Sequence, residues 1–334
     1  MIIRDEEYKL KLSDKAVFNN KGIDKPFTQL LLFFVLILLV IFLSIKSPFF
    51  FTWNNIRNIL DQTSLHLILA IGMTFVISSG GIDLSVGSVV ALSGIVIGFM
   101  LKSDASIVAS SLLGMLVGGM LGLLNGVIIS RLKIDSFVVT IGSMSLYRGV
   151  SLVVTEGQPI YGFPIEFTYF GKGNIGEINP PIVIAGFIVL LAFLIFKYTK
   201  WGQYTLAIGG NEEALRRVGV NTNLYKSSIY MFSGFCAGLG GLILASRLNA
   251  AEPNAGFMLE TNIIAAVILG GTSMKGGRAS VSGTTIACIL LSVMRNGLTI
   301  LSISSYYQQL FIGFIILFSV SISEVRKRSQ VQIL

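Results

Sequence analysis

The chain has 334 residues, of which 53% are hydrophobic and only 13% are charged, and its mean hydropathy is +0.78. Soluble domains carry about 25% charged residues, so this composition indicates an all-α polytopic membrane protein. The net charge of +8 is therefore attributed to Lys and Arg at the cytoplasmic surface of a membrane, not to nucleic-acid binding. One histidine, and two cysteines in apolar stretches, predict neither a histidine metal cluster nor a disulfide framework.

The apolar segments predict ten transmembrane helices, since a span needs about 20 mostly apolar residues. In chain order they are 27–45, 64–79, 86–101, 107–129, 136–154, 181–196, 227–246, 261–272, 280–300 and 306–323. The first is expected to stay in the membrane, because its apolar run is too long for a signal sequence and no small-residue cleavage pattern follows it. A charged segment at 1–26 and a basic tail at 324–334 then flank a transmembrane domain at 27–323.

The distribution of Lys and Arg predicts the orientation. With the N-terminus inside and the spans alternating, 18 of the 25 basic residues fall in inside segments, five in outside segments, and Arg148 and Arg295 within spans. This bias predicts that both termini are cytoplasmic. Three outside segments, 46–63, 155–180 and 247–260, are then long enough to be recognised by another protein, and 155–180 is expected to be a structured loop.

One inside segment, Asn211–Gly219, is polar and lies between two long apolar stretches. Its pattern predicts a helix of about two turns, with an asparagine cap, acidic residues in the first turn, basic residues in the last turn and a glycine at the end. A helix held at the membrane surface is a place where a separate motor subunit can push on a transporter. The alternative is a charged loop that only satisfies the topology. The expected coupling residues are Asn211, Glu212, Glu213, Leu215, Arg216, Arg217 and Gly219.

A second polar segment, Ser78–Ser88, interrupts the apolar helices and holds Asp83. Its glycines break the helix, and serines such as Ser85 can satisfy the freed backbone groups. An ionisable group in such a break is costly unless it lines a cavity or has a partner, which predicts a polar hinge beside a solute path. The alternative is a cytoplasmic turn whose aspartate caps the next helix. Gly80–Gly87 also resembles Gly276–Gly283, and one interpretation is an internal repeat.

Four further polar residues are candidates for the translocation path: Asn125, Arg148, Arg295 and Asn296. The arginines are expected to line a polar interior or to contact Asp83, although Arg148 could instead extend to the membrane interface. The asparagines either hydrogen-bond a polar solute or hold helices together, at about 0.6 kcal/mol each in lipid.

Small residues at regular spacing predict close helix packing on two of the spans. The first stripe consists of Gly114, Gly118, Gly122 and Gly126, and the second of Gly234, Gly238 and Gly241. Spacing alone leaves open whether these helices pack within one subunit or between two.

Several motifs lie in order between about residues 27 and 323. They are Asn58–Thr63, Gly80–Ser88, Ala207–Glu213 and Val267–Ser273, with Arg247–Gly256 and Ser304–Gln308. Together they resemble the membrane permease subunits of binding-protein-dependent ABC importers of the ribose/galactose/xylose type, and the last two are closest to ribose permeases. The chain departs from many relatives at Asn262, where they carry an acidic residue two positions after the equivalent of Glu260.

The resemblance implies a permease subunit that carries a monosaccharide across the cytoplasmic membrane of a prokaryote, and ribose is the leading candidate for that sugar. It implies three partners: a cytoplasmic ABC ATPase with two fused cassettes, an extracytoplasmic sugar-binding protein, and a second permease, either a copy or a paralogue. It also implies that Asn211–Gly219 contacts the ATPase. The permease itself is then no enzyme and binds no cofactor, because ATP and Mg belong to the ATPase. The chain has no Gly-rich phosphate loop followed by Lys-Ser/Thr.

An ion-coupled secondary transporter of a small polar solute is the alternative function. Such a protein is expected to carry more intramembrane carboxylates or histidines than Asp83 alone. A membrane-embedded enzyme is disfavoured because the sequence shows no His/Asp/Glu cluster. Among solutes, xylose, galactose, a polyol and a furanose-like signalling molecule stay open beside ribose.

Overall fold

The computed structural model describes residues 24–304, together with 306, 307, 310, 313 and 314. The predicted tail, nearly all of the predicted cytoplasmic N-terminal segment and most of the predicted tenth span lie outside the described residues. The elements are α2 (Asp24–Lys46), α3 (Trp53–Ser78), α4 (Val86–Lys102), α5 (Ile107–Leu132), α6 (Ser136–Val154), β1 (Ile160–Tyr161), the 3₁₀ helix η1 (Ile165–Thr168), α7 (Tyr169–Lys172), α8 (Pro180–Tyr198), α9 (Lys200–Arg217), α10 (Thr222–Leu248), β2 (Ala250–Ala251), α11 (Leu259–Leu269) and α12 (Val281–Ile300).

Nine predicted spans coincide with described helices. Within the described part of the chain, seven helices are long and apolar enough to cross a membrane, while α4 and α11 are shorter apolar helices. The all-α, polytopic class is confirmed, and the count of ten stays a prediction. Most of the predicted outside segment 46–63 is helical, because α3 already begins at Trp53. Its first turns are polar, so a search for apolar runs misses them.

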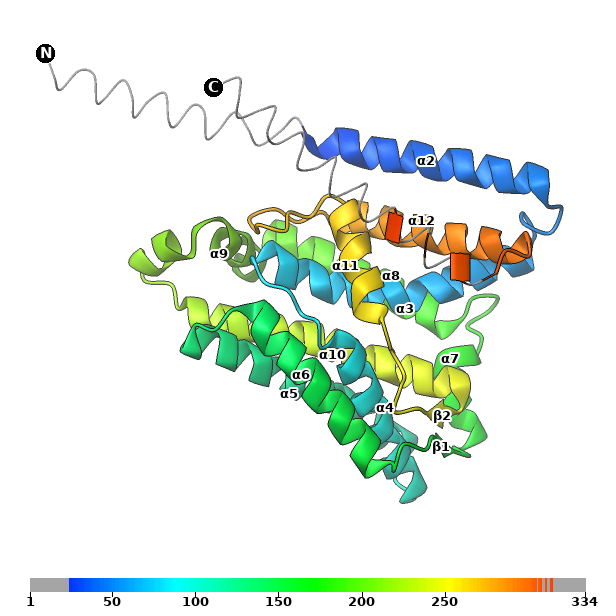
Figure 1. Ribbon diagram of the computed structural model, residues 1–334, viewed down its shortest axis with the longest axis horizontal. Helices are drawn as coiled ribbons and strands as arrows, with labels where there is room; N and C mark the ends of the chain where they lie inside the picture. Colours follow the sequence, from blue (N-terminus) through cyan, green and yellow to red (C-terminus); the bar gives the residue numbers. More distant parts are fainter. Residues whose placement is uncertain (1–23, 305, 308–309, 311–312, 315–334) are drawn as a thin grey trace, which may run out of the picture.

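Helices α3 and α10 form the interior of the bundle. In their most apolar stretches 78% and 72% of the residues are buried, against 11% in α2 and 22% in α6 and α8. Helix α10 packs against α5, α4 and α3. Figure 1 shows it running between one layer of helices, α4 to α6, and a second layer formed by α3, α8 and α12. A movement of α10 would therefore displace the helices that pack against it on both sides.

The two glycine stripes meet where α5 lies along α10, within one chain. A Cβ atom on Gly118 would lie 2.5 Å from the carbonyl oxygen of Gly234, and one on Gly126 would lie 2.7 Å from Cα of Ser227. The two backbones approach this closely only because the residues between them have no side chains. The outer members of the stripes, Gly114 and Gly241, face α4 instead of each other.

The predicted outside segments gather at one end of the bundle. Strands β1 and β2 pair there in antiparallel register, with Ile160 opposite Ala251. Arg247 of α10 forms an ion pair with Asp61 of α3 at 3.0 Å, and the side chain of Arg57 donates to Asn179 at 2.7 Å. The expected structured loop is thus present, as β1, η1 and α7 at this end (Figure 1).

The predicted inside segments gather at the opposite end. The backbone amide of Gly277 donates to the carbonyl of Ser78 at 2.9 Å, and a Cβ on Gly276 would lie 2.6 Å from Cα of Gly209. Gly80 lies beside the same point of α9. The two sequences that resemble each other, Gly80–Gly87 and Gly276–Gly283, therefore meet at α9 through their first glycines.

Candidate coupling site and the break at Asp83

The polar segment Asn211–Gly219, here called the coupling element, is the second half of α9. The sequence predicts a helix that starts at Asn211, but α9 already begins at Lys200 and is kinked at Asn211, where φ is −160° and ψ is 93°. The Asn211 carboxamide oxygen accepts the backbone amide of Ala214 at 2.9 Å, so it caps the second half as expected. Gly219, at φ +83°, lies just beyond the helix end. The first half of α9 was missed because its composition is too polar for a span.

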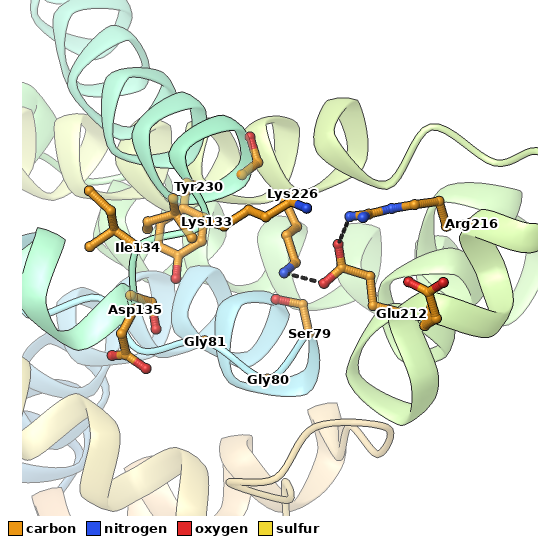
Figure 2. Close-up of a pocket in the computed structure, with 14 residues that line it drawn as sticks. Ser79, Gly80, Gly81, Lys133, Ile134, Asp135, Glu212, Arg216, Lys226 and Tyr230 are labelled. Atoms are coloured by element: carbon orange, nitrogen blue, oxygen red, sulfur yellow. Dashed lines mark hydrogen bonds and ion pairs between the residues drawn. The ribbon is translucent and has the colours of Figure 1, made fainter.

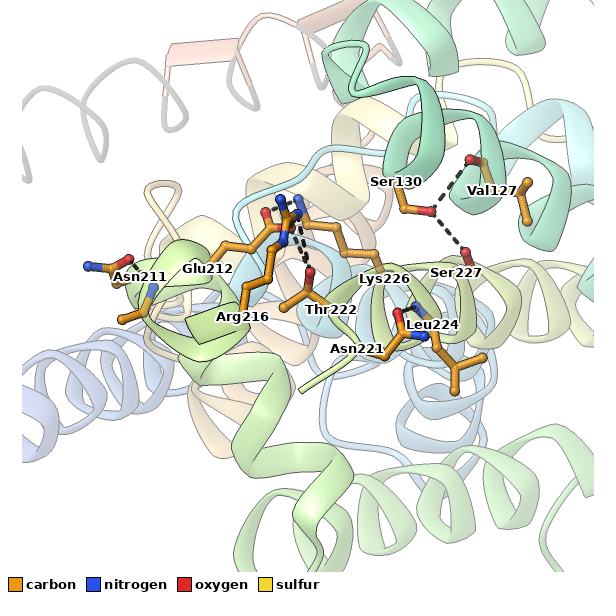
Figure 3. A network of polar contacts seen from close by, with 11 residues as sticks. Val127, Ser130, Asn211, Glu212, Arg216, Asn221, Thr222, Leu224, Lys226 and Ser227 are labelled. Carbon is orange, nitrogen blue, oxygen red and sulfur yellow. Dashed lines mark hydrogen bonds and ion pairs between the residues drawn. The ribbon is translucent and has the colours of Figure 1, made fainter. Parts of the chain in front are cut away.

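Glu212 is the most heavily bonded side chain of the coupling element. Its carboxylate lies 2.5 Å from Nζ of Lys226 and 2.9 Å from the guanidinium of Arg216, and it accepts the Thr222 hydroxyl at 3.0 Å. Figure 3 shows these groups converging from the coupling element and the first turn of α10. Glu213, in contrast, pairs among the described residues with Arg217 alone, at 3.5 Å on the exposed side.

The electrostatics of Glu212 follow from these contacts. Partial burial alone would raise the pKa of its carboxyl group. The hydrogen bond and the charge of Lys226, together with the Thr222 hydroxyl and the charge of Arg216, outweigh burial and hold the pKa of Glu212 below its ordinary value of 4.5. The carboxylate is therefore ionised at neutral pH and stays paired.

The coupling element leaves part of its apolar face uncovered. Ala214 and Val218 are exposed, and Val218 retains 75% of its accessible surface, while Leu215 packs partly against the core. An exposed apolar edge beside alternating charges suits docking to another protein.

Asp83 lies in the non-helical segment between α3 and α4, residues 79–85, here called the Asp83 break, and is only 1% exposed. One carboxylate oxygen accepts the Ser85 backbone amide at 3.0 Å and the Ser85 hydroxyl at 2.6 Å, and the other accepts the Ser233 hydroxyl at 3.3 Å. These bonds hold the start of α4 against α10. The expected contact of Arg148 or Arg295 with Asp83 is wrong: the hydrogen-bond partners that the described residues give Asp83 are an amide and two hydroxyls.

Asn125 extends this buried network to α5 and α6. Its amide nitrogen donates to the Ser85 hydroxyl at 2.9 Å, and its oxygen accepts the hydroxyls of Ser143 at 2.6 Å and Tyr147 at 3.0 Å. Every polar atom of the carboxamide thus has a partner from a neighbouring helix or from the break. Of the two roles left open by the sequence, this geometry matches the one that holds helices together.

The remaining candidates lie elsewhere in the bundle. The guanidinium of Arg148 donates to the carbonyls of Pro253 at 2.5 Å and Ala255 at 2.7 Å, in the turn before α11. Arg295 contacts His66 at 3.0 Å. The side chain of Asn296 exchanges hydrogen bonds of 2.8 and 3.1 Å with that of Asn55. Each candidate therefore ties two parts of the chain together, and the structure does not bring them to one place. The residues of these contacts are Asn55, His66, Arg148, Pro253, Ala255, Arg295 and Asn296.

A cavity of about 500 Å³ lies between the Asp83 break, the α5–α6 turn and the coupling element. Its walls carry hydroxyls, such as those of Ser130 and Tyr230, and charged groups of both signs, such as Lys133 and Glu212 (Figure 2). A mixed lining of this kind suits a neutral polar solute better than an ion. Among the described residues, no three His, Cys, Asp or Glu side chains are placed to hold a metal ion.

Sequence reasoning missed the residues of α10 that contact both polar regions. Lys226 and Thr222 bind Glu212, whereas Tyr230 and Ser233 bind the Asp83 break. One signal was available: Lys226, Tyr230 and Ser233 are spaced i, i+4 and i+7, so they share a face of an otherwise apolar helix.

The comparisons with known proteins agree with this architecture. The family described as the permease component of the branched-chain amino acid transport system matches residues 55–320. The ribose import permease protein of Haemophilus influenzae is 42% identical over 292 residues, which cover 86% of this chain and 90% of the relative. The Escherichia coli K12 ribose import permease protein is 39% identical over 87% of this chain and 92% of its own.

More distant relatives carry other names. The D-allose transport system permease protein of Escherichia coli K12 is 34% identical over 295 residues, which cover 88% of this chain and 90% of the relative. No solved structure matches the chain. The match over most of its length, together with multiple apolar helices, shows that the chain belongs to the family of multi-pass permease components of bacterial ABC importers, alongside the sugar import permeases.

Proposed function

We propose that this chain carries a monosaccharide into the cell, with ribose as the leading candidate. We also propose that the coupling element transmits the movements of a separate ATPase to the permease. The observation that carries the proposal is the meeting of four predicted inside segments at one end of the bundle, around the coupling element. Three of them, the Asp83 break, the α5–α6 turn and the coupling element, enclose the polar cavity. Relatives named ribose import permeases, 39–42% identical, support the choice of sugar.

The same proposal fixes the orientation and the partners. The coupling element faces the cytoplasm, both termini lie inside, and the spans number ten. An ATPase with two fused cassettes binds ATP and Mg and docks on the coupling element. A sugar-binding protein docks at the opposite end, on the segments around β1 and β2, and a second copy of the chain completes the channel. A paralogue in place of the second copy is the other assembly.

The solute path is proposed to pass the Asp83 break on its way to the cavity. Ser85 and Asn125 support this break from within the bundle. The path role predicted for Arg148, Arg295 and Asn296 stays a prediction. A path that binds the sugar only weakly suits a permease whose selectivity resides in a separate binding protein.

The test is ATP-dependent uptake of radiolabelled ribose into vesicles that hold this chain, its ATPase and its binding protein. The double variant Arg216→Glu/Arg217→Glu, which reverses the last turn of the coupling element, is measured alongside. We expect uptake only with ATP, and none in the variant although it folds and reaches the membrane. If the binding protein stimulates ATP hydrolysis but no ribose is taken up, the proposed importer function stands and ribose is excluded as its substrate. D-allose and galactose are then tested next. Uptake that follows an ion gradient without ATPase would support the secondary transporter instead.

A further inference from the structure

The kink at Asn211 separates the coupling element mechanically from the first half of α9. The non-helical dihedrals at this residue interrupt the continuous ladder of backbone hydrogen bonds that makes a helix stiff. The last residues before the kink, Gly209 and Gly210, pack against Gly276 and Gly277, so the bundle holds the first half of α9 and not the coupling element at this point. A push on the coupling element is therefore not carried into the bundle by α9 alone.

Glu212 ties the coupling element to α10 instead. Two of its three partners, Lys226 and Thr222, belong to the first turns of α10. Within the part of the chain that the structure describes, the neighbouring acid, Glu213, pairs with Arg217 inside the coupling element and so bridges to no other helix. The two adjacent glutamates therefore differ in one respect that matters here: one bridges two elements and the other does not.

The face of α10 that binds Glu212 also binds the Asp83 break. Lys226, Tyr230 and Ser233 follow one another along this face, about 10 Å from first to last at 1.5 Å per residue. The Tyr230 hydroxyl donates to the carbonyl of Ile82 at 3.4 Å, and the Ser233 hydroxyl donates to Asp83 at 3.3 Å. A displacement of the first turn of α10 along its axis therefore moves the groups that hold the break.

We propose that Glu212 is a positioning residue that transmits movement of the coupling element, through this face of α10, to the break at Asp83. The proposal rests on the proposed function, because it assumes that the coupling element receives the work of an ATPase. Loss of the bridge leaves the ATPase docked and active, but its cycle no longer moves the break. ATP hydrolysis then continues while solute movement falls.

The test compares Glu212→Gln with the control Lys200→Gln in vesicles that hold the full complex; Lys200 is an exposed charged residue of α9 that lies before the kink and outside the coupling element. Ribose uptake and ATP hydrolysis are measured on the same vesicles and divided, so that any loss of folded complex cancels. We expect Glu212→Gln to lower the ribose taken up per ATP about tenfold, which corresponds to about 1.4 kcal/mol and is within the usual range of coupling energies between contacting groups. We expect Lys200→Gln to leave this ratio unchanged. An unchanged ratio in Glu212→Gln, or an equal fall in both variants, overturns the proposal.

Lys226→Gln and the double variant Glu212→Gln/Lys226→Gln show whether the two side chains act as one bridge. The double variant is expected to be no worse than either single variant. Losses that multiply would mean that the residues act separately, and the bridge is then wrong. The unaltered complex separates the two levels of inference: if it takes up none of ribose, D-allose and galactose with ATP, the proposed function fails before any variant is compared.

Discussion

Two stretches of α10 do different work with different chemistry. In its first turns, Thr222 and Lys226 hold the coupling element through an ion-pair cluster whose carboxylate side chain is 27% exposed. Farther along, α10 packs its glycines against α5 and binds the Asp83 break through hydroxyls, all buried. The first stretch relies on charge at the surface, and the second on close packing and neutral donors in the interior.

The difference follows from the cost of charge in each environment. An unpaired charge inside a bilayer is expensive, whereas ion pairs at a surface contribute only about 0–1 kcal/mol and can separate at little cost. The interior stretch therefore supplies stability, and the surface stretch can act as a joint. Variants of the interior should lower stability, and variants of the surface cluster should change coupling while stability hardly moves.

The largest expected effect comes from the glycine contact between α5 and α10. In Gly118→Ala the new Cβ would lie 2.5 Å from the carbonyl oxygen of Gly234, so the helices must move apart. We expect a loss of about 1–3 kcal/mol in the free energy of unfolding, measured by thermal unfolding of the purified protein in detergent. The adjacent Gly119→Ala is the control, because its nearest neighbour would be 3.7 Å away. Equal losses in the two variants would show that the close contact is not what matters.

The next effect concerns the carboxyl group of Asp83. In Asp83→Ala the buried amide and hydroxyl of Ser85 lose their acceptor, which costs about 1–3 kcal/mol in the free energy of unfolding. Asp83→Asn keeps an acceptor for Ser85 and offers a donor to Ser233, so we expect stability and solute uptake close to those of the unaltered protein. If Asp83→Asn abolishes uptake while the variant remains folded, the negative charge of Asp83 is itself needed. The statement that the interior stretch of α10 relies on close packing and neutral donors is then wrong.

The sequence was sufficient for features that depend on a short stretch of chain. Spans such as 136–154 coincide with α6 because a membrane-spanning helix needs one long, mostly apolar stretch of sequence. The cap at Asn211 was predictable for the same reason, since it depends on the next three residues only. The family motifs, taken together, also allowed the overall multi-pass helical fold to be predicted from the sequence.

Features that depend on tertiary contacts could not be read from local patterns. The first half of α9 is polar enough to read as a loop, and it is helical because it packs between α8, α10 and α3. Arg295 looked like a partner for Asp83 because both lie in apolar surroundings, yet it contacts His66. Glu212 and Glu213 look alike in sequence, and the positions of Lys226 and Thr222 in the folded chain make Glu212 the bridge.

The smallest expected effect on stability belongs to that bridge, and pH reveals it. Because the folded state lowers the pKa of Glu212, the cluster stabilises the protein above the unfolded pKa of about 4.5, and this contribution is lost as the pH falls through the lower folded pKa. Thermal unfolding should therefore separate the unaltered protein from Glu212→Gln by at most about 1 kcal/mol at pH 7, and the gap should close toward acid pH. A gap that persists or widens in acid would mean that charge is not what joins the coupling element to α10.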